Sequence, residues 1–312
     1  MKRVVTLLLS LAALYASEPI APIPLNIEYD AEKASLGREL FFDPRLSKDG
    51  SVACVNCHAL PGSGADPNPV SFGVGGAKGI FNSPTVLNAV FNFSQFWDGR
   101  APDLETQAKG PIANGIEMAL PLPDAVAVLK GDDHYRERFA TLYPDGITAE
   151  NLVNAIAEFE RTLITPNAPF DRYLRGEPNV LSPEALQGYE LFKKRGCISC
   201  HNGINIGGNL YQKSGVFSEG KLKMHPKHFG RYNVTGREKD KYYFKVPTLR
   251  NISLTAPYFH DGSVFDLETA VRTMMEYQLG IIPDSDEIRA IVAFLKTLEG
   301  DTPPFLIQEQ SR

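Results

Sequence analysis

Apolar residues spaced to share one face of a helix occur twice in the chain, near residues 152–163 and again near residues 288–298. They are Leu152, Ile156, Phe159 and Leu163, and then Ile288, Ile291, Val292, Leu295 and Leu298. The alternation typical of strands is scarce, and Gly and Pro gather in long segments such as residues 61–79 and 203–220. The pattern therefore predicts a mainly α-helical protein with long loops.

The first residues of the chain have a different pattern. Lys2 and Arg3 precede an apolar run over residues 4–14, and Ala16 follows as a small residue suited to cleavage. This pattern predicts a secretory signal peptide over residues 1–16. The alternative is an uncleaved membrane anchor, but a helix that spans a bilayer needs about 20 apolar residues. The short run therefore favours export of the chain.

Length and charge exclude several classes of protein. The 312 residues are enough for about two domains of roughly 150 residues each. A hydrophobic content of 43% is typical of a folded protein and excludes a disordered chain. The net charge of −5 argues against binding to nucleic acids, whose phosphates attract basic surfaces. We therefore expect two folded domains and no nucleic-acid partner.

Every cysteine of the chain lies in a Cys-x-x-Cys-His motif, first at Cys54, Cys57 and His58, then at Cys197, Cys200 and His201. This motif attaches c-type haem: the two thiols bind the haem vinyl groups and the histidine is an axial ligand of the iron. A four-cysteine zinc site needs no histidine after each pair, and a thioredoxin-like redox site needs only one pair. The sequence therefore predicts two covalently bound haem c groups.

The similarity between the two halves extends well beyond these motifs, which indicates an internal duplication. Four segments recur in the same order: Gly37-Arg-Glu39-Leu40-Phe41 with Gly188-Tyr-Glu190-Leu191-Phe192, Pro84-Thr85-Val-Leu-Asn88 with Pro247-Thr248-Leu-Arg-Asn251, Trp97-Asp98-Gly99 with His260-Asp261-Gly262, and Asp103-Leu104-Glu105-Thr106 with Asp266-Leu267-Glu268-Thr269. The proline-containing segment 164–169 cannot continue a helix and is predicted to link the halves. We therefore expect two cytochrome c-type haem domains, at residues 17–165 and 166–312.

Further iron ligands are unevenly distributed between the halves. Between Cys57 and Cys197 the sequence offers, besides His58, only His134, which lies in a charged stretch and is expected to be solvated, and Met118. The second half offers either Met274 or Met275, whereas His225 and His228 are expected at the surface. An iron with an open sixth position can activate a small molecule, so the first half is the candidate site of chemistry.

Two residues of the first half are open to two interpretations. Trp97, the only Trp in the chain, occupies the position that His260 has in the second half; it is either a core residue or part of a path that couples the haems. Glu117 is either solvated or, if it faces an open haem pocket, an acid or base that moves a proton between the oxygens of a bound peroxide. The residues alone leave both open.

At this level of detail the chain resembles the bacterial dihaem cytochrome c peroxidases over nearly all of its length. The shared motifs are Phe81-Asn-Ser-Pro-Thr-Val-Leu-Asn-Ala-Val-Phe-Asn, Gln95-Phe-Trp-Asp-Gly-Arg100, Gln107-Ala-Lys-Gly-Pro, Leu249-Arg-Asn251, Thr255-Ala-Pro-Tyr-Phe-His-Asp-Gly262 and Tyr277-Gln-Leu-Gly280. The resemblance implies periplasmic reduction of hydrogen peroxide to water. The implied electron donor is a small cytochrome c or a cupredoxin, and the implied assembly is a homodimer.

The resemblance also implies roles for individual residues. The haem on His58 is implied to react with peroxide, and the haem on His201 and Met274 to receive electrons at high potential. Gln107 and Glu117 match the pair in the distal pocket, and Trp97 matches the residue between the haems. Asn82, together with the backbone of Thr255 and Pro257, matches a calcium site between the domains.

One position departs from the pattern of many family members, in which a histidine in the loop after the first motif caps the peroxidatic iron of the oxidised enzyme. Here Val74 is found at that position. We therefore expect the first haem to be open without prior reduction. Two other functions remain: a dihaem enzyme of protein-cofactor maturation, which characteristically has Tyr in place of Met274, and an electron carrier without turnover, which requires two six-coordinate haems.

Overall fold

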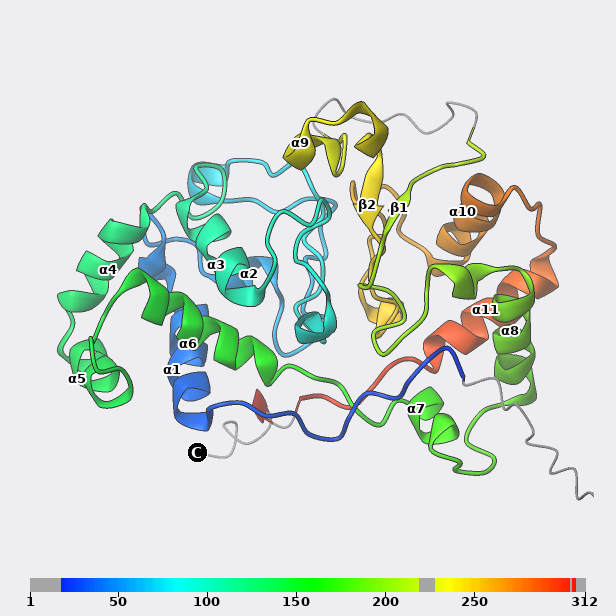
Figure 1. Ribbon diagram of the computed structural model, residues 1–312, viewed down its shortest axis with the longest axis horizontal. Coiled ribbons are helices and arrows are strands. Elements are labelled where there is room, and N and C mark those ends of the chain that lie inside the picture. Colours follow the sequence, from blue (N-terminus) through cyan, green and yellow to red (C-terminus); the bar gives the residue numbers. More distant parts are fainter. Residues whose placement is uncertain (1–17, 219–227, 304, 307–312) are drawn as a thin grey trace, which may run out of the picture.

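The computed structural model describes residues 18–218, 228–303 and 305–306 and forms two helical halves that lie side by side (Figure 1). The predicted signal peptide and His225 lie outside the described residues. Helices dominate, and the named strands of the described residues form one short two-stranded sheet. The expected mainly α-helical architecture is confirmed. Among the described residues, no helix has both the length and the apolar character needed to cross a membrane.

The first half is built around two crossing helices, α1 (Ala31–Phe42) and α6 (Ala149–Arg161). Around them lie α2 (Cys54–Cys57), α3 (Leu104–Ala113), α4 (Leu122–Lys130) and α5 (Asp133–Leu142), with the 3-10 turns η1 (Pro44–Leu46), η2 (Val74–Gly76) and η3 (Ala89–Phe91). The predicted apolar face of residues 152–163 is buried in this core. The helices cross closely because Gly37 has no side chain: a Cβ there would lie 1.8 Å from the Ala155 carbonyl oxygen.

The second half repeats this arrangement with α8 (Pro183–Lys194) crossing α11 (Ser285–Lys296). The other elements are α7 (Pro169–Leu174), η4 (Cys197–Ser199), β1 (Tyr211–Lys213), α9 (Tyr232–Thr235), η5 (Glu238–Asp240), β2 (Tyr243–Lys245), η6 (Ile252–Leu254) and α10 (Leu267–Leu279), with β1 and β2 antiparallel. Gly188 makes the same close crossing, since a Cβ there would lie 1.8 Å from the Ala290 carbonyl oxygen.

The repeated Asp-Leu-Glu-Thr segments are helix N-caps. The Asp103 carboxylate accepts the backbone N–H of Thr106 at 2.7 Å at the start of α3. Asp266 accepts that of Thr269 at 2.7 Å at the start of α10. A carboxylate in this position satisfies an N–H that the helix itself cannot bond and suits the positive end of the helix dipole. The repeat therefore fixes where these helices begin in both halves.

The two halves meet at another pair of repeated residues. Asn88 and Asn251 both adopt the left-handed conformation, with φ of 61° and 57°. Their side-chain amides donate to the same atom, the Thr165 hydroxyl, at 2.8 Å and 2.9 Å. All three residues are buried, so the equivalent loops are held together at the segment predicted to link the halves.

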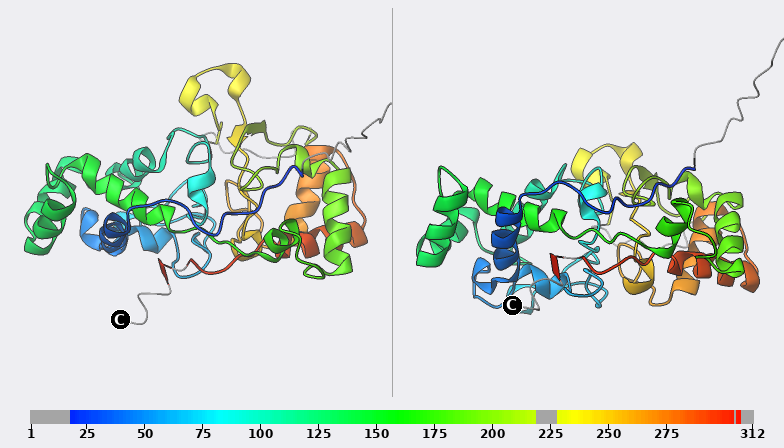
Figure 2. Two further views of the ribbon diagram at one scale, coloured as in Figure 1. Left: turned by 60° about the horizontal axis from the view of Figure 1, so that its bottom comes forward. Right: turned by 90° about the horizontal axis from the view of Figure 1, so that it is seen from below.

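The ends of the described chain cross between the halves, as both views of Figure 2 show. Near the N-terminus, Ile20 is buried in the core of the second half, and the Ala21 carbonyl accepts a hydrogen bond from Arg250 at 2.9 Å. Near the C-terminus, Leu306 is buried in the core of the first half. The division at residues 165 and 166 stays a prediction, and each half buries a segment from the opposite end of the chain.

Candidate active site

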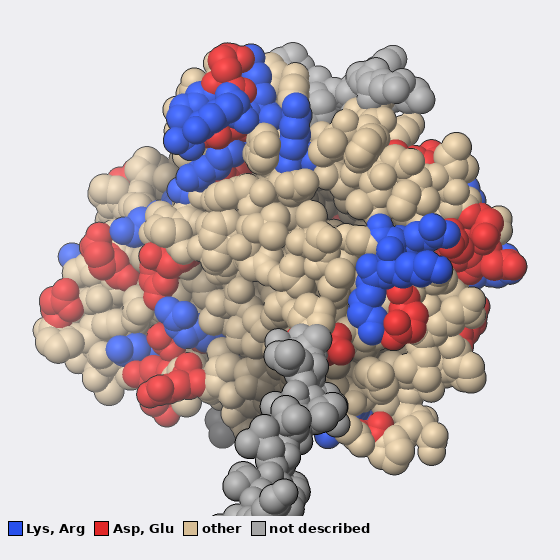
Figure 3. Space-filling view, turned by 45° about the vertical axis from the view of Figure 1, so that its right-hand side comes forward, with Lys and Arg blue, Asp and Glu red and all other residues tan. Residues whose placement is uncertain are grey.

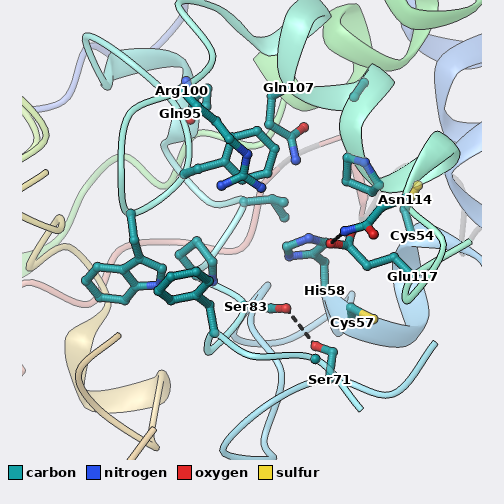
Figure 4. Close-up of a pocket in the computed structure, with 18 of the residues that line it drawn as sticks. Cys54, Cys57, His58, Ser71, Ser83, Gln95, Arg100, Gln107, Asn114 and Glu117 are labelled. Carbon is teal, nitrogen blue, oxygen red and sulfur yellow. Dashed lines mark hydrogen bonds between the residues drawn. The ribbon is translucent and has the colours of Figure 1, made fainter. Parts of the chain in front are cut away.

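The first Cys-x-x-Cys-His motif lies on the wall of a cavity of about 960 Å³ in the first half (Figure 4). The single turn of α2 places Cys54 and Cys57 one turn apart, and neither is in a disulfide. The His58 ring faces the same cavity, and its Nδ1 lies 3.2 Å from the Gly64 carbonyl oxygen. That contact fixes Nδ1 as the protonated nitrogen and leaves Nε2 free as a ligand.

The chemistry of these three side chains fits a covalently attached haem. Burial lowers the pKa of His58, which keeps the imidazole neutral, the form that binds a metal. Burial also raises the pKa of both thiols, so they are neutral and unpaired beside the cavity. The same wall therefore supplies two groups for thioether bonds and one axial ligand.

Polar side chains from α3 and the turn after it enter the cavity (Figure 4). Gln107 comes from α3, and Glu117 follows the end of that helix. The Glu117 carboxylate accepts a hydrogen bond from the Asn114 side-chain amide at 2.6 Å. Burial raises the pKa of Glu117, while Asn114 and the charge of Arg100 act in the opposite direction. The structure thus brings Gln107 and Glu117 together at the cavity that His58 borders.

Arg100 is a cavity residue to which the sequence assigned no role. Its guanidinium stacks on the Phe96 ring, 3.4 Å from the centroid, and donates to Asp98 at 3.0 Å. These contacts hold a positive charge at the edge of the cavity. A signal was present in the sequence, because the repeat has Trp97-Asp98-Gly99-Arg100 in the first half but Ser263 in place of arginine in the second.

The loop with Val74 is held beside Glu117 by backbone hydrogen bonds. The Val74 N–H donates to the Glu117 carbonyl at 2.8 Å, and Gly73 and Ala77 are bonded across the loop at 2.8 Å. Gly73 lines the cavity, whereas Val74 packs against the core of the first half. Among the described residues that line this cavity, His58 is the only histidine.

Glu160 is a second acid of this cavity that the sequence analysis did not single out. It is 4% exposed on α6, and its Oε2 has no hydrogen-bond partner among the described residues. Burial, together with the negative charge of Glu105, raises the pKa of Glu160 to about 8. The carboxyl is therefore neutral at pH 7 and is a polar group beside the cavity rather than a charge.

The second motif borders a separate cavity in the other half, lined by Cys197, Cys200 and His201. His201 repeats the geometry of His58, with its Nδ1 lying 3.3 Å from the Ile206 carbonyl oxygen. Both neighbouring methionines of α10 also line this cavity. Met275 is 1% exposed and packs in the core, whereas Met274 is 36% exposed, so Met274 has the more accessible sulfur.

Trp97 lies between the two cavities and lines both. Its indole N–H donates to the Asn82 carbonyl at 2.9 Å, and its own carbonyl accepts the backbone N–H of Lys245 at 2.8 Å. His260 meets Trp97 edge to face, with the ring centroids 6.3 Å apart. The repeat-equivalent residues Trp97 and His260 are thus in contact at the boundary between the halves.

The three residues matched to a calcium site also gather at this boundary. Asn82, Thr255 and Pro257 all line the second cavity, and the Asn82 N–H donates to the His260 carbonyl at 2.9 Å. Asn82 offers an amide oxygen, and Thr255 and Pro257 offer backbone carbonyl oxygens, the donor type that Ca²⁺ prefers. The donor chemistry therefore fits a calcium ion.

The expectation of a surface position was right for His134 and wrong for His228. The His134 side chain is 60% exposed, in contact with Glu39. His228 is 5% exposed, stacks on Phe81 and lies 2.5 Å from the Ile80 carbonyl oxygen through Nε2. The aromatic rings at the boundary between the halves bury His228, and the His-Pro-Lys-His stretch in which it lies gave no sign of this.

Family models divide the chain in the same way as its helices. Residues 31–179 match the family described as di-haem cytochrome c peroxidase, and residues 185–299 match the family described as cytochrome c. Each model includes one Cys-x-x-Cys-His motif. The prediction of two cytochrome c-type haem domains is confirmed at this level.

Curated proteins and solved structures show the same similarity over the whole chain. Cytochrome c551 peroxidase of Nitrosomonas europaea is 50% identical, with 95% of this chain and 91% of that protein covered. Cytochrome c peroxidase Ccp of Escherichia coli is 46% identical over 95% of this chain, which spans 64% of the length of that protein. A crystal structure of a MauG-like protein associated with microbial copper homeostasis matches with a TM-score of 0.78 at 28% identity, covering 90% of this chain and 93% of that one.

Proposed function

This chain belongs to the di-haem cytochrome c peroxidase family, and from that premise we propose that it reduces hydrogen peroxide to water in the cavity of its first half. The observation that carries the proposal is the arrangement of Glu117, Gln107 and Arg100 around the cavity beside His58. Haem, when bound through Cys54 and Cys57, supplies an iron that binds peroxide and passes electrons to it.

The side chains of the first cavity supply proton transfer and orientation. Reduction of one peroxide to two waters consumes two electrons and two protons, and the bond between the two oxygens breaks. Glu117 takes the proton from one peroxide oxygen and delivers it to the other, which leaves as water. The Asn114 amide holds the carboxylate in place, while the Gln107 amide and the Arg100 guanidinium orient the oxygens and stabilise developing negative charge.

The second half passes electrons to the first. His201 and Met274 would hold the iron of a haem there, and a thioether ligand raises the reduction potential of a haem. The exposure of Met274 in the cavity supports this choice over the buried Met275. Trp97 touches both cavities and so provides a short route between them. Met274 also argues against a function in cofactor maturation, for which Tyr is expected at this position.

The described residues that line the first cavity offer no second histidine to a haem held by His58, so prior reduction would be unnecessary. Val74 occupies the position at which a histidine would cap the iron, and its N–H is bonded to the Glu117 carbonyl. His58 is the only histidine among the described residues that line the cavity, so peroxide would reach the iron that His58 would hold.

The enzyme acts in the periplasm, after removal of residues 1–16, and receives electrons from a small cytochrome c or a cupredoxin. It forms a homodimer and binds calcium at Asn82, Thr255 and Pro257. Figure 3 shows basic side chains grouped at the top of the molecule, around η5. Next to η5 in the sequence, Arg237 and Lys241 form ion pairs with Asp240 and Glu238, so the mixed charge of this segment selects no particular donor.

A stoichiometric assay tests the proposed reaction. The haem-loaded protein is mixed with peroxide and a reduced small c-type cytochrome, and oxidation of the cytochrome is followed by its absorbance. We expect two equivalents of cytochrome to be oxidised for each peroxide consumed. Loss of peroxide without oxidation of the cytochrome, or no reaction with peroxide at all, would overturn the proposal.

A further inference from the structure

Lys245 is a buried cation at the boundary between the two halves. It ends β2, is 6% exposed and lines the second cavity together with His201 and Met274. Its backbone N–H donates to the Trp97 carbonyl at 2.8 Å, which fixes the chain beside the contact between the cavities. The position of Lys245 is thus set by the backbone, independently of its side chain.

The ammonium of Lys245 has no hydrogen bond or ion pair among the residues that the structure describes. Burial alone lowers the pKa of Lys245 to about 8, with no acidic group acting in the opposite direction. Arg250, another buried cation in this half, pairs with Asp171 at 2.6 Å. A buried charge without a partner is costly, so an anionic group bound in this cavity would be stabilised beside Lys245.

The duplication shows that this charge is specific to the second half. Counted from the repeated Pro84 and Pro247, Lys245 is equivalent to Asn82, and both residues are buried. The two positions even make matching backbone bonds, Lys245 to the Trp97 carbonyl and Asn82 to the His260 carbonyl, at 2.8 Å and 2.9 Å. The two halves therefore have the same backbone contact at this position, and the second half has a cation where the first half has a neutral amide.

We propose that Lys245 binds a propionate carboxylate of the haem in the second cavity and raises the reduction potential of that haem above that of the first. Haem has two carboxylates, and the residues that line this cavity in the structure include no Asp or Glu. A fixed positive charge beside the haem favours the iron state with one fewer positive charge, which is the reduced state. The inference rests on the proposed function only in requiring haem in the second cavity.

Spectroelectrochemical titration of the haem-loaded protein without peroxide tests this role. The neutral variants are Lys245→Gln and Lys245→Met, and Lys245→Arg keeps the charge. Lys213→Gln is the matched control, because Lys213 lines the same cavity but is exposed. In the neutral variants, the ratio of reduced to oxidised second haem at a fixed applied potential should fall about tenfold, which is about 59 mV for a one-electron couple.

The control and the charge-keeping variant should stay within about twofold of the wild-type ratio. Unchanged second-haem potentials in both neutral variants, or an equal shift in Lys213→Gln, would overturn the proposal. Where a neutral variant does not retain haem, Lys245→Arg decides: a wild-type potential supports the pairing and a lowered one contradicts it. Because no peroxide is present, a shifted potential in a protein without peroxidase turnover would refute only the proposed function.

Discussion

The two halves of the molecule share one scaffold and differ in the walls of their cavities. Gly37 and Gly188 allow the same close crossing of two helices, and a Cβ at either would lie 1.8 Å from a carbonyl oxygen. Asn88 and Asn251 bond the same Thr165 hydroxyl. The shared contacts lie at helix crossings and loop junctions. The packing there is so close that an added side-chain atom would displace the neighbouring backbone.

The differences lie at equivalent positions that line the first cavity. Glu160 of α6 corresponds to Leu295 of α11, and Arg100 corresponds to Ser263. Glu160 and Arg100 line the first cavity, whereas Leu295 lines the second cavity and Ser263 is exposed outside it. The additional acid and cation suit a cavity in which peroxide binds, whereas a cavity that only transfers electrons does not need them. The duplication thus separates the residues that specify the fold from those that specify the chemistry.

The largest effect is expected from removing the proton carrier of the first cavity. Glu117→Gln keeps the size and the contact with Asn114 but cannot carry a proton, so peroxidase turnover should fall roughly 10²–10⁴-fold. Glu150→Gln is the control, because Glu150 is a solvent-exposed acid at the start of α6. Steady-state oxidation of reduced cytochrome measures the peroxidase turnover of both variants. Turnover within tenfold of wild type in Glu117→Gln would mean that another group moves the proton.

The neighbouring methionines of α10 allow the second cavity to be tested with a matched pair. Met274→Leu should lower the potential of the second haem and reduce turnover roughly tenfold, because the thioether ligand is lost. Met275→Leu should leave the potential unchanged and cost less than about 1.5 kcal/mol of unfolding free energy, as a core substitution of similar volume. Redox titration measures the potential of the second haem in each variant, and chemical denaturation measures the free energy of unfolding. The reverse pattern would assign the ligand to Met275.

A smaller effect, on stability, is expected at Glu160. Its pKa is about 8 in the fold against an ordinary value of 4.5, so the folded state holds the proton more tightly. The free energy of unfolding should therefore fall as pH rises from about 4.5 to about 8, by at most a few kcal/mol. Glu160→Gln removes this loss, so its stability relative to wild type should increase between pH 5 and pH 8. Urea denaturation at pH 5 and pH 8 measures the free energy of unfolding of both proteins. If the difference between variant and wild type is the same at the two pH values, Glu160 lies in a solvated environment.

The elements that repeat or follow a helical period could be predicted from the sequence. The apolar residues of 152–163 and 288–298 are the core faces of α6 and α11, and the Asp103 and Asp266 segments are caps. Local pattern is sufficient for these elements because each depends on contacts within a few residues or on one buried face.

Other features depend on contacts between distant segments and could not be predicted in this way. Ile20 and Leu306 are apolar residues in non-periodic segments, so nothing local shows that each packs in the half at the other end of the chain. His228 follows Lys227 in a short His-Pro-Lys-His stretch that gives no helical or strand period, yet aromatic rings surround it in the fold. Lys245 was detectable only by comparing the repeats position by position, because a lone lysine usually lies at the surface.

The spin state of the oxidised protein tests most directly whether the first cavity is open. Electron paramagnetic resonance of the fully oxidised, haem-loaded protein should show a high-spin signal, since Val74 supplies no ligand opposite His58. One equivalent of peroxide, without reductant, should convert that signal at once. Two low-spin haems that react with peroxide only after one electron is added would contradict the open cavity, and with it the assignment of peroxide chemistry to the oxidised first half.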